Sequence, residues 1–412
     1  MAVPKLFTSE SVSAGHPDKL ADSISDSILD AIFEQDPDSR VAVETLVTNG
    51  LVQVAGEVRT KASVNIAKVV RNRILDVGYD SSEKSFDGNT CAVNIAISEQ
   101  SPDIAQGVDN SVEWQEGHHD KFDHIGAGDQ GLVFGGAVAE NKDFLPTPIH
   151  LAHRIIADLQ TTRRIGGKFW LYPDAKTQVT IRYSDDGVPE AVETIVLSTQ
   201  HSEELDIALL REVIENLLEG LLKEYNQEQA NNGFPVLDVS NVKYFINPTG
   251  RFVIGGPKGD AGLTGRKIIV DTYGGFFRHG GGAFSGKDYT KVDRSAAYAA
   301  RWVAKNIVAA GLASKAEIQI AYAIGVARPV SISVDTFGSN TVPEKVLEDA
   351  VQEVFDLRPA AINAALNLQN VKYLPTSTGG HFGRQASDTA FTWERLDKVQ
   401  ELIDAVKTGR DE

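Results

Sequence analysis

Residues 41–58, VAVETLVTNGLVQVAGEV, alternate apolar and polar side chains on both sides of Asn49-Gly50. An Asn-Gly pair between two alternating runs is a strong local signal for a β-hairpin with a two-residue turn. The pattern recurs in QVTIRYSDDGVPEAVETIVLSTQ (178–200), which turns near Asp186-Gly187, and in IQIAYAIGVARPVSISVDTF (318–337). The hairpins begin near residues 41, 178 and 317, so the chain is predicted to contain a threefold internal repeat.

Helical periodicity flanks each hairpin. The first hairpin lies between two apolar stripes with helical spacing, one of Leu20, Ile24, Ile28 and Ile32 and one of Val64, Ala67, Val70 and Ile74 that ends at Gly78. Further helices are predicted at about 148–164, 203–225, 293–310 and 343–355. The fold class is therefore α+β, with three similar domains, each an antiparallel or mixed sheet covered by helices on one face. The predicted ranges are 1–106, 132–243 and 244–412, with 107–131 between the first two.

The turn at residues 49 and 50 fixes the register of the first hairpin. It pairs Glu44 with Ala55 and Ala42 with Glu57, and it places the valines on one face, which is predicted to be the core side. Glu44 and Glu57 then lie diagonally on the other face, about 7–8 Å apart between their Cα atoms. They are either solvated surface carboxylates or part of a second interface that holds a cation or an ammonium group.

The segment GVDNSVEWQEGHHDKFDHIGAGDQG, residues 107–131, follows neither the helical nor the strand period. Long irregular segments in compact proteins often form lids over active sites, so a flexible gate is one hypothesis. A linker between repeats is the other. His118, His119 and His124, with Asp120 and Asp123, match no strong metal-binding spacing, and a polar loop is favoured over a metal site.

Composition excludes several classes of protein. The formal net charge of −17 disfavours nucleic acid or an anionic membrane surface as a partner. The N-terminus has no apolar stretch of signal-peptide length and no run of about 18 apolar residues occurs, so a soluble, cytoplasmic protein is expected. The single Cys91 excludes an intramolecular disulfide and a Cys-based zinc cluster, and its strand-like surroundings predict a core thiol.

Residues 251–305 form a basic island, with ten Lys and Arg against four Asp, and they hold 11 of the 36 glycines. Cations and flexible backbone N–H groups together suit a small polyanion, although a mobile basic loop has the same composition. Within the island, HGGGAFSGKD (279–288) resembles a P-loop, but Asp288 stands where Ser or Thr is required and no helix begins directly after it. Lys287 and Lys291, with Arg266 and Lys267 of GDAGLTGRK (259–267), are therefore expected to act as side-chain cations on a polyphosphate.

The motif SVSAGHPDKLADSISD (11–26) predicts a helix that starts at Pro17, with His16 near the N-cap. His16 and Lys19 at this positive helix end are candidate phosphate ligands. Asp18, and Asp293 at the start of a later helix, are candidate magnesium ligands, although each could simply favour the helix dipole.

Five motifs in this order, GHPDK, GAGDQG, DAK (174–176), GDAGLTGRK and GGGAFSGKD, resemble the S-adenosylmethionine synthetase (methionine adenosyltransferase) family of the bacterial type. The resemblance extends from about residue 7 to residue 384. It implies pseudo-threefold symmetry and a homotetramer of tight dimers, with active sites shared between two subunits of each dimer. It also implies that methionine attacks the 5′ carbon of ATP, and that the tripolyphosphate formed is hydrolysed to diphosphate and phosphate. Residues 107–131 would be the gate, lengthened here by EWQEGHHDKFDH.

The resemblance also implies roles for individual residues. The implied catalytic residues are His16, Lys176, Arg266 and Lys287. The implied ATP contacts are His16, Asp174, Lys176, Arg251, Phe252, Asp260, Arg266, Lys267, Ala283 and Lys287. The implied methionine contacts are Glu57, Gln100, Asp129, Asp260 and Lys291. Two Mg²⁺ ions per site would be bound by Asp18 and Asp293, and one K⁺ by Glu44.

Two rival functions stay open on the sequence. A small-molecule kinase explains the lysines and the magnesium-binding carboxylates, but not the repeats or the paired glutamates, and it would release ADP. A non-catalytic nucleotide sensor requires no histidine at a helix start and would bind without turnover.

Overall fold

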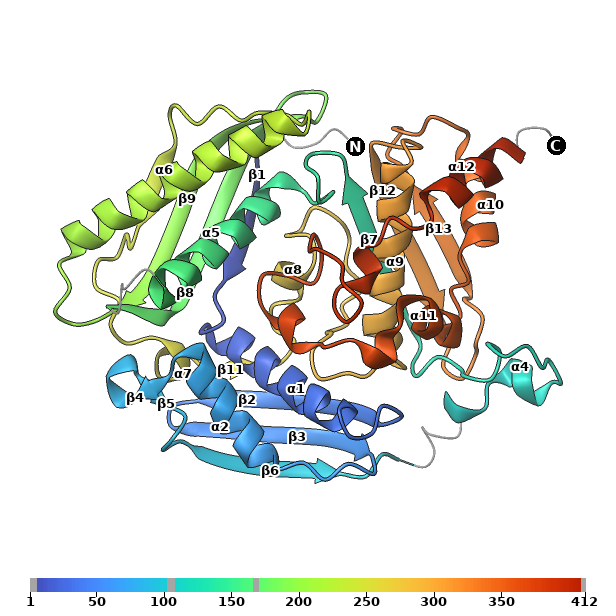
Figure 1. Cartoon of the computed structure of the whole chain (residues 1–412), viewed down its shortest axis with the longest axis horizontal. Coiled ribbons are helices and arrows are strands. Elements are labelled where there is room, and N and C mark those ends of the chain that lie inside the picture. Colours follow the sequence, from blue (N-terminus) through green and yellow to red (C-terminus); the bar gives the residue numbers. More distant parts are fainter. Residues whose placement is uncertain (1–5, 102–107, 166–169, 409–412) are drawn as a thin grey trace.

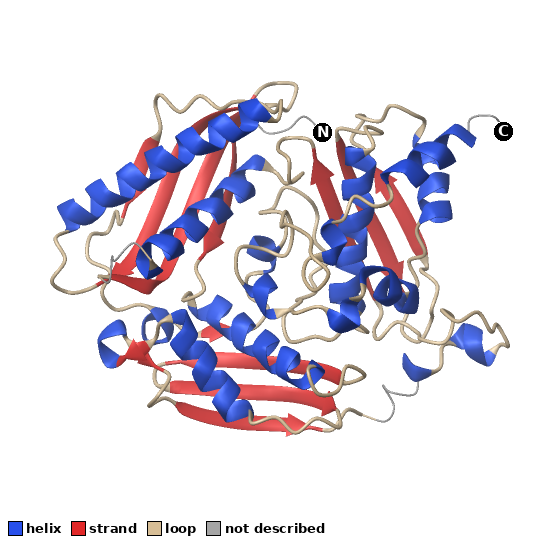
Figure 2. Ribbon diagram, in the orientation of Figure 1, coloured by secondary structure: helices blue, strands red, loops and turns tan. Residues whose placement is uncertain are grey.

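A computed structural model describes residues 6–101, 108–165 and 170–408. Three β-sheets surround a central region of loops, and helices cover one face of each sheet (Figures 1 and 2). This confirms the predicted α+β class and its three-domain organisation. Within the described residues, no helix has the length and apolar character needed to cross a membrane.

The first sheet has the strand order β11-β2-β3-β6 and carries α1 (Pro17–Phe33) and α2 (Ile66–Val77). The hairpin of β2 (Arg40–Thr48) and β3 (Leu51–Arg59) has the predicted register, with Ala42 opposite Glu57 and Glu44 opposite Ala55. β6 (Ala92–Ser98) runs parallel to β3, and the two-residue β11 (Gly262–Leu263) pairs antiparallel with β2. The valines point into the core as predicted, and Cys91 is buried beside them.

The second sheet has the order β1-β8-β9-β10 and is covered by α5 (Thr147–Arg164) and α6 (Ile207–Asn231). Its hairpin consists of β8 (Leu171–Tyr183) and β9 (Pro189–His201). β1 (Leu6–Val12) pairs antiparallel with β8, and β10 (Lys243–Ile246) lies parallel to β9. This arrangement repeats that of the first sheet, because each hairpin has an antiparallel neighbour on one side and a parallel neighbour on the other.

The third sheet has the order β13-β12-β7, with α9 (Val292–Ala309) packed against it. The hairpin strands are β12 (Lys315–Tyr322) and β13 (Ser331–Asp335), and β7 (Gly131–Val138) pairs antiparallel with β12. Other short elements complete the chain. They are β4 (Asp80–Ser81), β5 (Phe86–Asp87), α4 (Val112–Gln115), α7 (Gly256–Gly259), α8 (Ile268–Asp271), α10 (Glu344–Val354), α11 (Pro359–Leu366) and α12 (Val399–Thr408), with 3-10 turns at Ser82–Lys84, Leu368–Asn370, Leu374–Ser377 and Thr392–Glu394.

The sheets do not follow the three contiguous ranges expected from the sequence. β1, from the N-terminal range, belongs to the second sheet, and β7, at the start of the central range, belongs to the third. β11, from the C-terminal range, completes the first sheet. Each repeat therefore gives one edge strand to another repeat, because backbone pairing at a sheet edge requires only an accessible strand and no local sequence signature.

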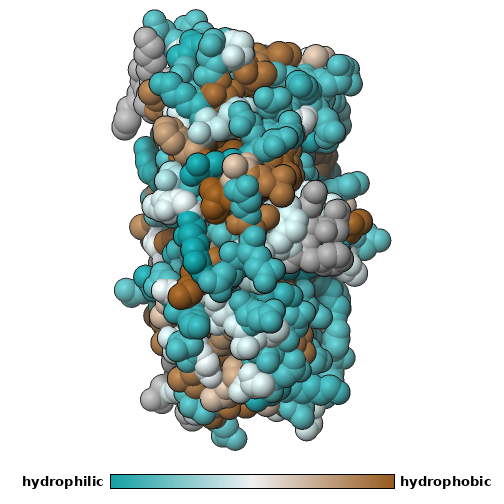
Figure 3. All heavy atoms as spheres, turned by 90° about the vertical axis from the view of Figure 1, so that its left-hand side faces the viewer, coloured by the Kyte–Doolittle hydropathy of each residue, from teal (hydrophilic) through white to brown (hydrophobic). Residues whose placement is uncertain are grey.

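Buried ion pairs surround α9, and one of them joins two repeats. Arg294 of α9 contacts both carboxylate oxygens of Asp26 in α1, at 2.8 and 3.0 Å. Arg301 and Lys305 of the same helix share the buried carboxylate of Glu394. On the outside the protein is largely hydrophilic, with apolar side chains in limited patches, when viewed from the left-hand side of Figure 1 (Figure 3).

The irregular segment is described from residue 108, and the start of the predicted gate lies outside the described residues. Polar contacts attach it to the third repeat. The Glu113 carboxylate accepts hydrogen bonds from the backbone N–H groups of Ala327 and Arg328, at 2.8 and 2.9 Å. Arg358 contacts Asp120 and Asp123 at 2.9 and 2.7 Å. The segment thus has no apolar stripe but is still fixed at specific points.

Candidate active site

The first candidate group surrounds the start of α1. His16 is the N-cap residue, and its Nδ1 accepts a hydrogen bond from the N–H of Asp18 at 3.2 Å. Burial, and then the charge of Lys267, lower the pKa of His16 to about 4, although Asp18 opposes this shift. The imidazole is therefore neutral at pH 7, with its proton on Nε2, where it can serve as a hydrogen-bond donor.

The glycine-rich turn 259–267 packs directly on this helix start. The Asp18 carboxylate accepts hydrogen bonds from Lys267 Nζ at 2.6 Å and from the N–H of Leu263 at 3.0 Å, and Arg266 lies 4.0 Å away. Burial alone would raise the pKa of Asp18, but these bonds hold it below its ordinary value. The turn therefore brings two predicted cations to a buried, ionised carboxylate.

The second glycine-rich stretch, 279–288, is attached to the first hairpin. The N–H of Val43 donates to the carbonyl of Gly286, and the N–H of Asp288 donates to the carbonyl of Val41. Gly286 has φ 79°, and a Cβ there would lie 1.9 Å from the Val43 carbonyl oxygen, so only glycine fits. The fully buried Asp288 accepts hydrogen bonds from the N–H of Val41 and from Thr290, so it anchors the loop where a P-loop would hold a metal ion.

The start of α9 provides the second candidate group. Lys287 lies 2.7 Å from the Asp293 carboxylate, and Lys291, the N-cap residue, lies 2.5 Å from Asp288. These lysines line a cavity of about 320 Å³ together with side chains from the first hairpin and from the end of the irregular segment. Six predicted site residues line this cavity: Glu57, Gln100, Asp129, Lys287, Lys291 and Asp293. The buried Gln100 amide oxygen has no hydrogen-bond partner within the described residues.

The two groups meet at one point. Ala283, in the second glycine-rich stretch, lies beside Gly265 of the first, since a Cβ on Gly265 would come within 2.5 Å of the Ala283 Cβ. The Glu57 cavity, however, includes no residue from the start of α1. Among the described residues, the predicted site is therefore divided between two neighbouring surfaces.

Other predicted residues lie around the α1 group. Asp174 is buried and accepts a hydrogen bond from the N–H of Gly256, and its burial, with repulsion from Asp260, raises its pKa to about 7. Lys176 pairs with Glu10 at 2.8 Å and also lowers the pKa of His16. Arg251 is exposed and paired with Glu203, and the N–H of Phe252 donates to His201. Glu44 is exposed on the open face of the first sheet.

Three family models cover almost the whole chain. They are the N-terminal, central and C-terminal domains of S-adenosylmethionine synthetase, matching residues 4–102, 124–252 and 254–395. The chain belongs to the S-adenosylmethionine synthetase family. It is 58% identical over 407 residues to the S-adenosylmethionine synthase of Leifsonia xyli subsp. xyli, covering 98% of this chain and 99% of that protein. The synthase of Mycobacterium marinum is 57% identical over 406 residues, with 98% and 99% covered.

Membership of the S-adenosylmethionine synthetase family makes the chain a methionine adenosyltransferase, whose substrates are ATP and methionine. The synthase of Mycolicibacterium gilvum, 56% identical over 412 residues, covers 98% of this chain and is itself covered completely, at 100%. The three models follow the same order as the three sequence repeats.

The structure corrects the expected role of Lys19. Lys19 is 1% exposed and lies between the carboxylates of Asp22 and Asp271, at 3.0 and 2.5 Å. It therefore joins α1 to α8 and does not face a ligand. Sequence reasoning also missed Tyr79, whose buried hydroxyl donates to the carbonyl of Gly15 at 2.6 Å and fixes the turn before His16.

Two histidines of the irregular segment pack against an aromatic ring. The rings of His119 and His124 both pack edge-on against Trp114, with centroids 4.9 Å away. Among the described residues, no group of three or more His, Cys, Asp or Glu side chains is arranged to hold a metal ion.

Proposed function

We propose that the chain forms S-adenosylmethionine by joining the methionine sulfur to the 5′ carbon of ATP, and that it hydrolyses the released tripolyphosphate to phosphate and diphosphate. The observation that carries this proposal is the 320 Å³ cavity, in which residues from four segments of the chain converge: the first hairpin, 100–101, 128–129 and 287–293. A thioether is a weak neutral nucleophile, so most of the acceleration must come from alignment of sulfur, carbon and leaving oxygen.

The lining of the cavity suits a zwitterionic amino acid. The carboxylates of Glu57 and Asp129 and the unpartnered amide oxygen of Gln100 can accept hydrogen bonds from an ammonium group. Lys291 supplies a cation for the carboxylate of the substrate. Asp129 and Asp260 are the candidates to offset the positive charge of the sulfonium product.

The phosphate chain of ATP would lie between the two glycine-rich stretches. Arg266, Lys267, Lys287 and Lys176 supply the cations, with Arg251, Phe252, Asp174 and Ala283 around the rest of the nucleotide. His16 carries its proton on Nε2 and donates a hydrogen bond to the leaving oxygen as negative charge develops there.

The donor set fits the implied metals. Mg²⁺ in nucleotide sites is usually held by one or two protein carboxylates together with phosphate oxygens and water. Asp18 and Asp293 each offer one carboxylate, and each is already paired with a lysine from a glycine-rich stretch. Bound Mg²⁺ would neutralise charge on the leaving polyphosphate. Glu44 would contribute to a K⁺ site.

Because the predicted site residues are divided between the start of α1 and the Glu57 cavity, we expect each active site to be shared between two copies of the chain. The open face of the first sheet is partly apolar and carries Glu44 and Glu57, while Ile95 is 45% exposed on its outer strand. We propose that two copies pair through this face, so that the α1 group of one copy meets the Glu57 cavity of the other. Two such dimers form the homotetramer, and the protein works in the cytoplasm.

The test is incubation with ATP, methionine, Mg²⁺ and K⁺, followed by mass spectrometry and phosphate analysis. The expected products are S-adenosylmethionine, phosphate and diphosphate in equal amounts, without ADP. Accumulation of tripolyphosphate, with no phosphate or diphosphate formed, would refute the hydrolytic step. Formation of ADP would favour a kinase. Sedimentation in parallel tests the shared site, because a fully active monomer would contradict it.

A further inference from the structure

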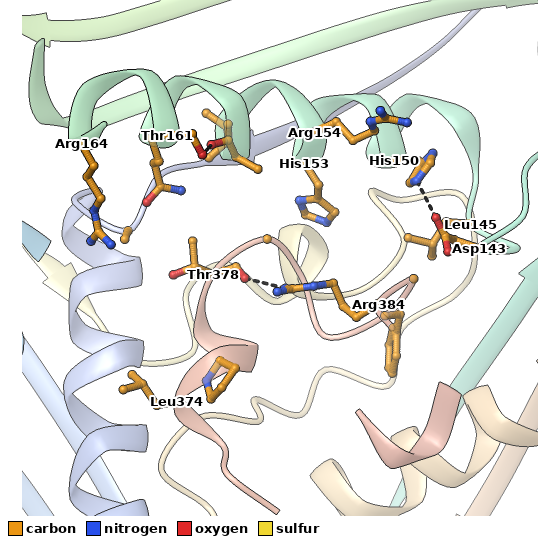
Figure 4. A pocket seen from close by; sticks show the side chains of 18 of the residues that line it. Asp143, Leu145, His150, His153, Arg154, Thr161, Arg164, Leu374, Thr378 and Arg384 are labelled. Carbon is orange, nitrogen blue, oxygen red and sulfur yellow. Dashed lines mark hydrogen bonds and ion pairs between the residues drawn. The ribbon is translucent and has the colours of Figure 1, made fainter. Parts of the chain in front are cut away.

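A cavity of about 840 Å³ lies outside the candidate active site. It is bounded by α5 and by the chain from Leu374 to Arg384 (Figure 4). None of the residues predicted to bind ATP, methionine or metal lines it. The adenosyltransferase reaction therefore gives this space no role.

The cavity is cationic in a protein with a net charge of −17. Five Lys and Arg side chains line it, against the two carboxylates of Asp143 and Glu228. Glu228 is paired with Lys142 and Arg154, and Asp143 lies 3.1 Å from His150. Arg73, Arg164 and Arg384 are left, and none of them forms an ion pair with a described residue.

Backbone carbonyls accept hydrogen bonds from two of these three arginines but leave their charges uncompensated. Arg164 donates to the carbonyl of Asp76 at 2.9 Å, and Arg384 donates to the carbonyl of Thr378 at 2.8 Å. A carbonyl oxygen satisfies a donor but does not neutralise a guanidinium. The buried Nε of Arg73 lacks even a carbonyl acceptor, because it has no hydrogen-bond partner within the described residues. Its burial lowers its pKa to about 10, helped by repulsion from Arg164 and opposed by the attraction of Asp76.

Two histidines of α5 also present unused polar atoms. His153 is 7% exposed, and its Nδ1 lies 2.8 Å from the Ser11 hydroxyl, while its Nε2 has no partner among the described residues. In Figure 4 its ring points from α5 toward the space above Arg384. His150 is equally buried, and its Nδ1 is likewise unpartnered in the described structure; because its Nε2 faces the Asp143 carboxylate, Nδ1 of the neutral ring is an acceptor that suits a donor group of a ligand and not its phosphate oxygens. Unsatisfied buried groups are costly, so a ligand that satisfies them would be stabilised.

We propose that this cavity is a second anion site, which binds a phosphorylated small molecule separately from the substrates. Guanidinium groups match phosphate oxygens in geometry and charge, and three of them are available here. The apolar side chains of Leu145, Ile156 and Phe382 line the same space and can hold the non-phosphate part of the ligand. A volume of about 840 Å³ is in the range of small-molecule sites.

Occupancy of this site would reach the catalytic region through the chain before α1. Ala14 lines the cavity, and His16 follows two residues later at the start of the helix. Ser11, bonded to His153, lies in β1, which ends at Val12, two residues before Ala14. This link to turnover rests on the proposed role of His16, whereas binding in the cavity does not.

The test is calorimetric titration with pyrophosphate, which carries the anion chemistry without an apolar part. Because the proposed active site also binds pyrophosphate, the titration is done on wild type and on Lys287→Gln. In both backgrounds, the double change Arg73→Gln and Arg384→Gln is expected to remove one bound pyrophosphate per chain, or to weaken that site at least tenfold. Lys223→Gln, at an exposed cation that does not line the cavity, is the matched control and should change nothing.

Arg164→Gln alone, at an exposed position, serves if the double variant does not fold, and it should weaken the same site. A crystal soaked in selenate should give an anomalous peak next to His153 Nε2. Unchanged pyrophosphate stoichiometry and affinity in the cavity variants would overturn the proposal. The failure of this site leaves the product assay unaffected, so it is distinguishable from failure of the proposed function.

Discussion

Helices α1 and α9 begin in the same way but in different surroundings. Each has an aspartate in its first turn, and each aspartate is paired with a lysine from a glycine-rich stretch, at 2.6 Å for Asp18 and 2.7 Å for Asp293. The Asp18 side chain is only 5% exposed and accepts an additional backbone hydrogen bond. Asp293 is 30% exposed and borders an open cavity.

The difference indicates how the same element, a helix start with an aspartate in its first turn, can be rigid in one repeat and accessible in another. The start of α1 is preorganised, because its carboxylate, its N-cap histidine and the turn 259–267 hold one another in place. The start of α9 is accessible, and it lies next to Gly128 and Asp129 at the end of the irregular segment. A buried pair contributes to folding as well as to binding, whereas an exposed pair contributes little to folding.

The largest effect should come from His16, which has no counterpart at α9. His16→Asn is expected to slow adenosyl transfer by about a hundredfold or more, since a donor to the leaving oxygen is lost. Hydrolysis of added tripolyphosphate should fall much less, because that step does not expel the anion from carbon. Both rates can be followed by phosphate release, with His118→Asn as the control on an exposed loop. An equal loss in both half-reactions would contradict this role.

His16 should also make stability depend on pH. Its pKa is about 4 in the folded chain and 6.5 ordinarily, so between these values the unfolded chain binds more protons. Stability therefore falls as the pH drops from 6.5 to 4. The contribution is on the order of 2 kcal/mol, allowing for the partial exposure of the ring. Urea unfolding at several pH values should have a shallower pH dependence in His16→Asn than in wild type, at equal protein concentration.

Removal of the two carboxylates gives a direct comparison of the helix starts. Asp18→Asn leaves Lys267 without its buried counter-charge, and it should lower the free energy of unfolding by about 1.5 kcal/mol. Asp293→Asn should lower it by less than about 0.5 kcal/mol. Both should weaken Mg²⁺-dependent turnover. Equal losses of stability, measured by urea unfolding, would mean that the two pairs are not as different as their exposure indicates.

The smallest effect concerns the segment beside α9. Glu113→Gln weakens the two hydrogen bonds to Ala327 and Arg328, and limited proteolysis between residues 108 and 131 should become a few-fold faster. ATP analogue plus methionine should slow cleavage if the segment closes over the substrates. Glu116→Gln, on an exposed side chain of the same segment, is the control. Cleavage that is insensitive to ligands would favour a linker over a gate.

Local signals in the sequence predicted much of the fold. The Asn49-Gly50 turn fixes the register of its hairpin, and each predicted helix has a clear apolar stripe. The pairing of β1 with β8 could not be predicted in this way, because the paired residues are more than 160 positions apart in the sequence and no turn connects the two strands. Edge strands that cross between repeats leave no periodic trace.

The candidate site was predicted less evenly. The motifs indicated the residues that line the Glu57 cavity, but spacing could not separate Lys19 from the other cations. Lys19 and Asp271 are 252 positions apart, so the buried pair becomes visible only in three dimensions. In the sequence, Asp288 is only a departure from the P-loop pattern. In the structure, its buried carboxylate anchors the loop by accepting a hydrogen bond from the N–H of Val41. How the two surfaces meet across copies of the chain stays a prediction.

The exchange of edge strands has a consequence for synthesis on the ribosome. The first sheet lacks β11 until residue 263 has emerged, and β1 must wait for β8 although it is made first. Nascent repeats therefore expose unpaired edges while translation proceeds, which invites wrong pairing between neighbouring chains. A fragment that ends after the first or second repeat would lack a strand in at least one sheet. We expect the emergence of β11, and not the completion of the first repeat, to set the moment at which the first sheet can fold completely.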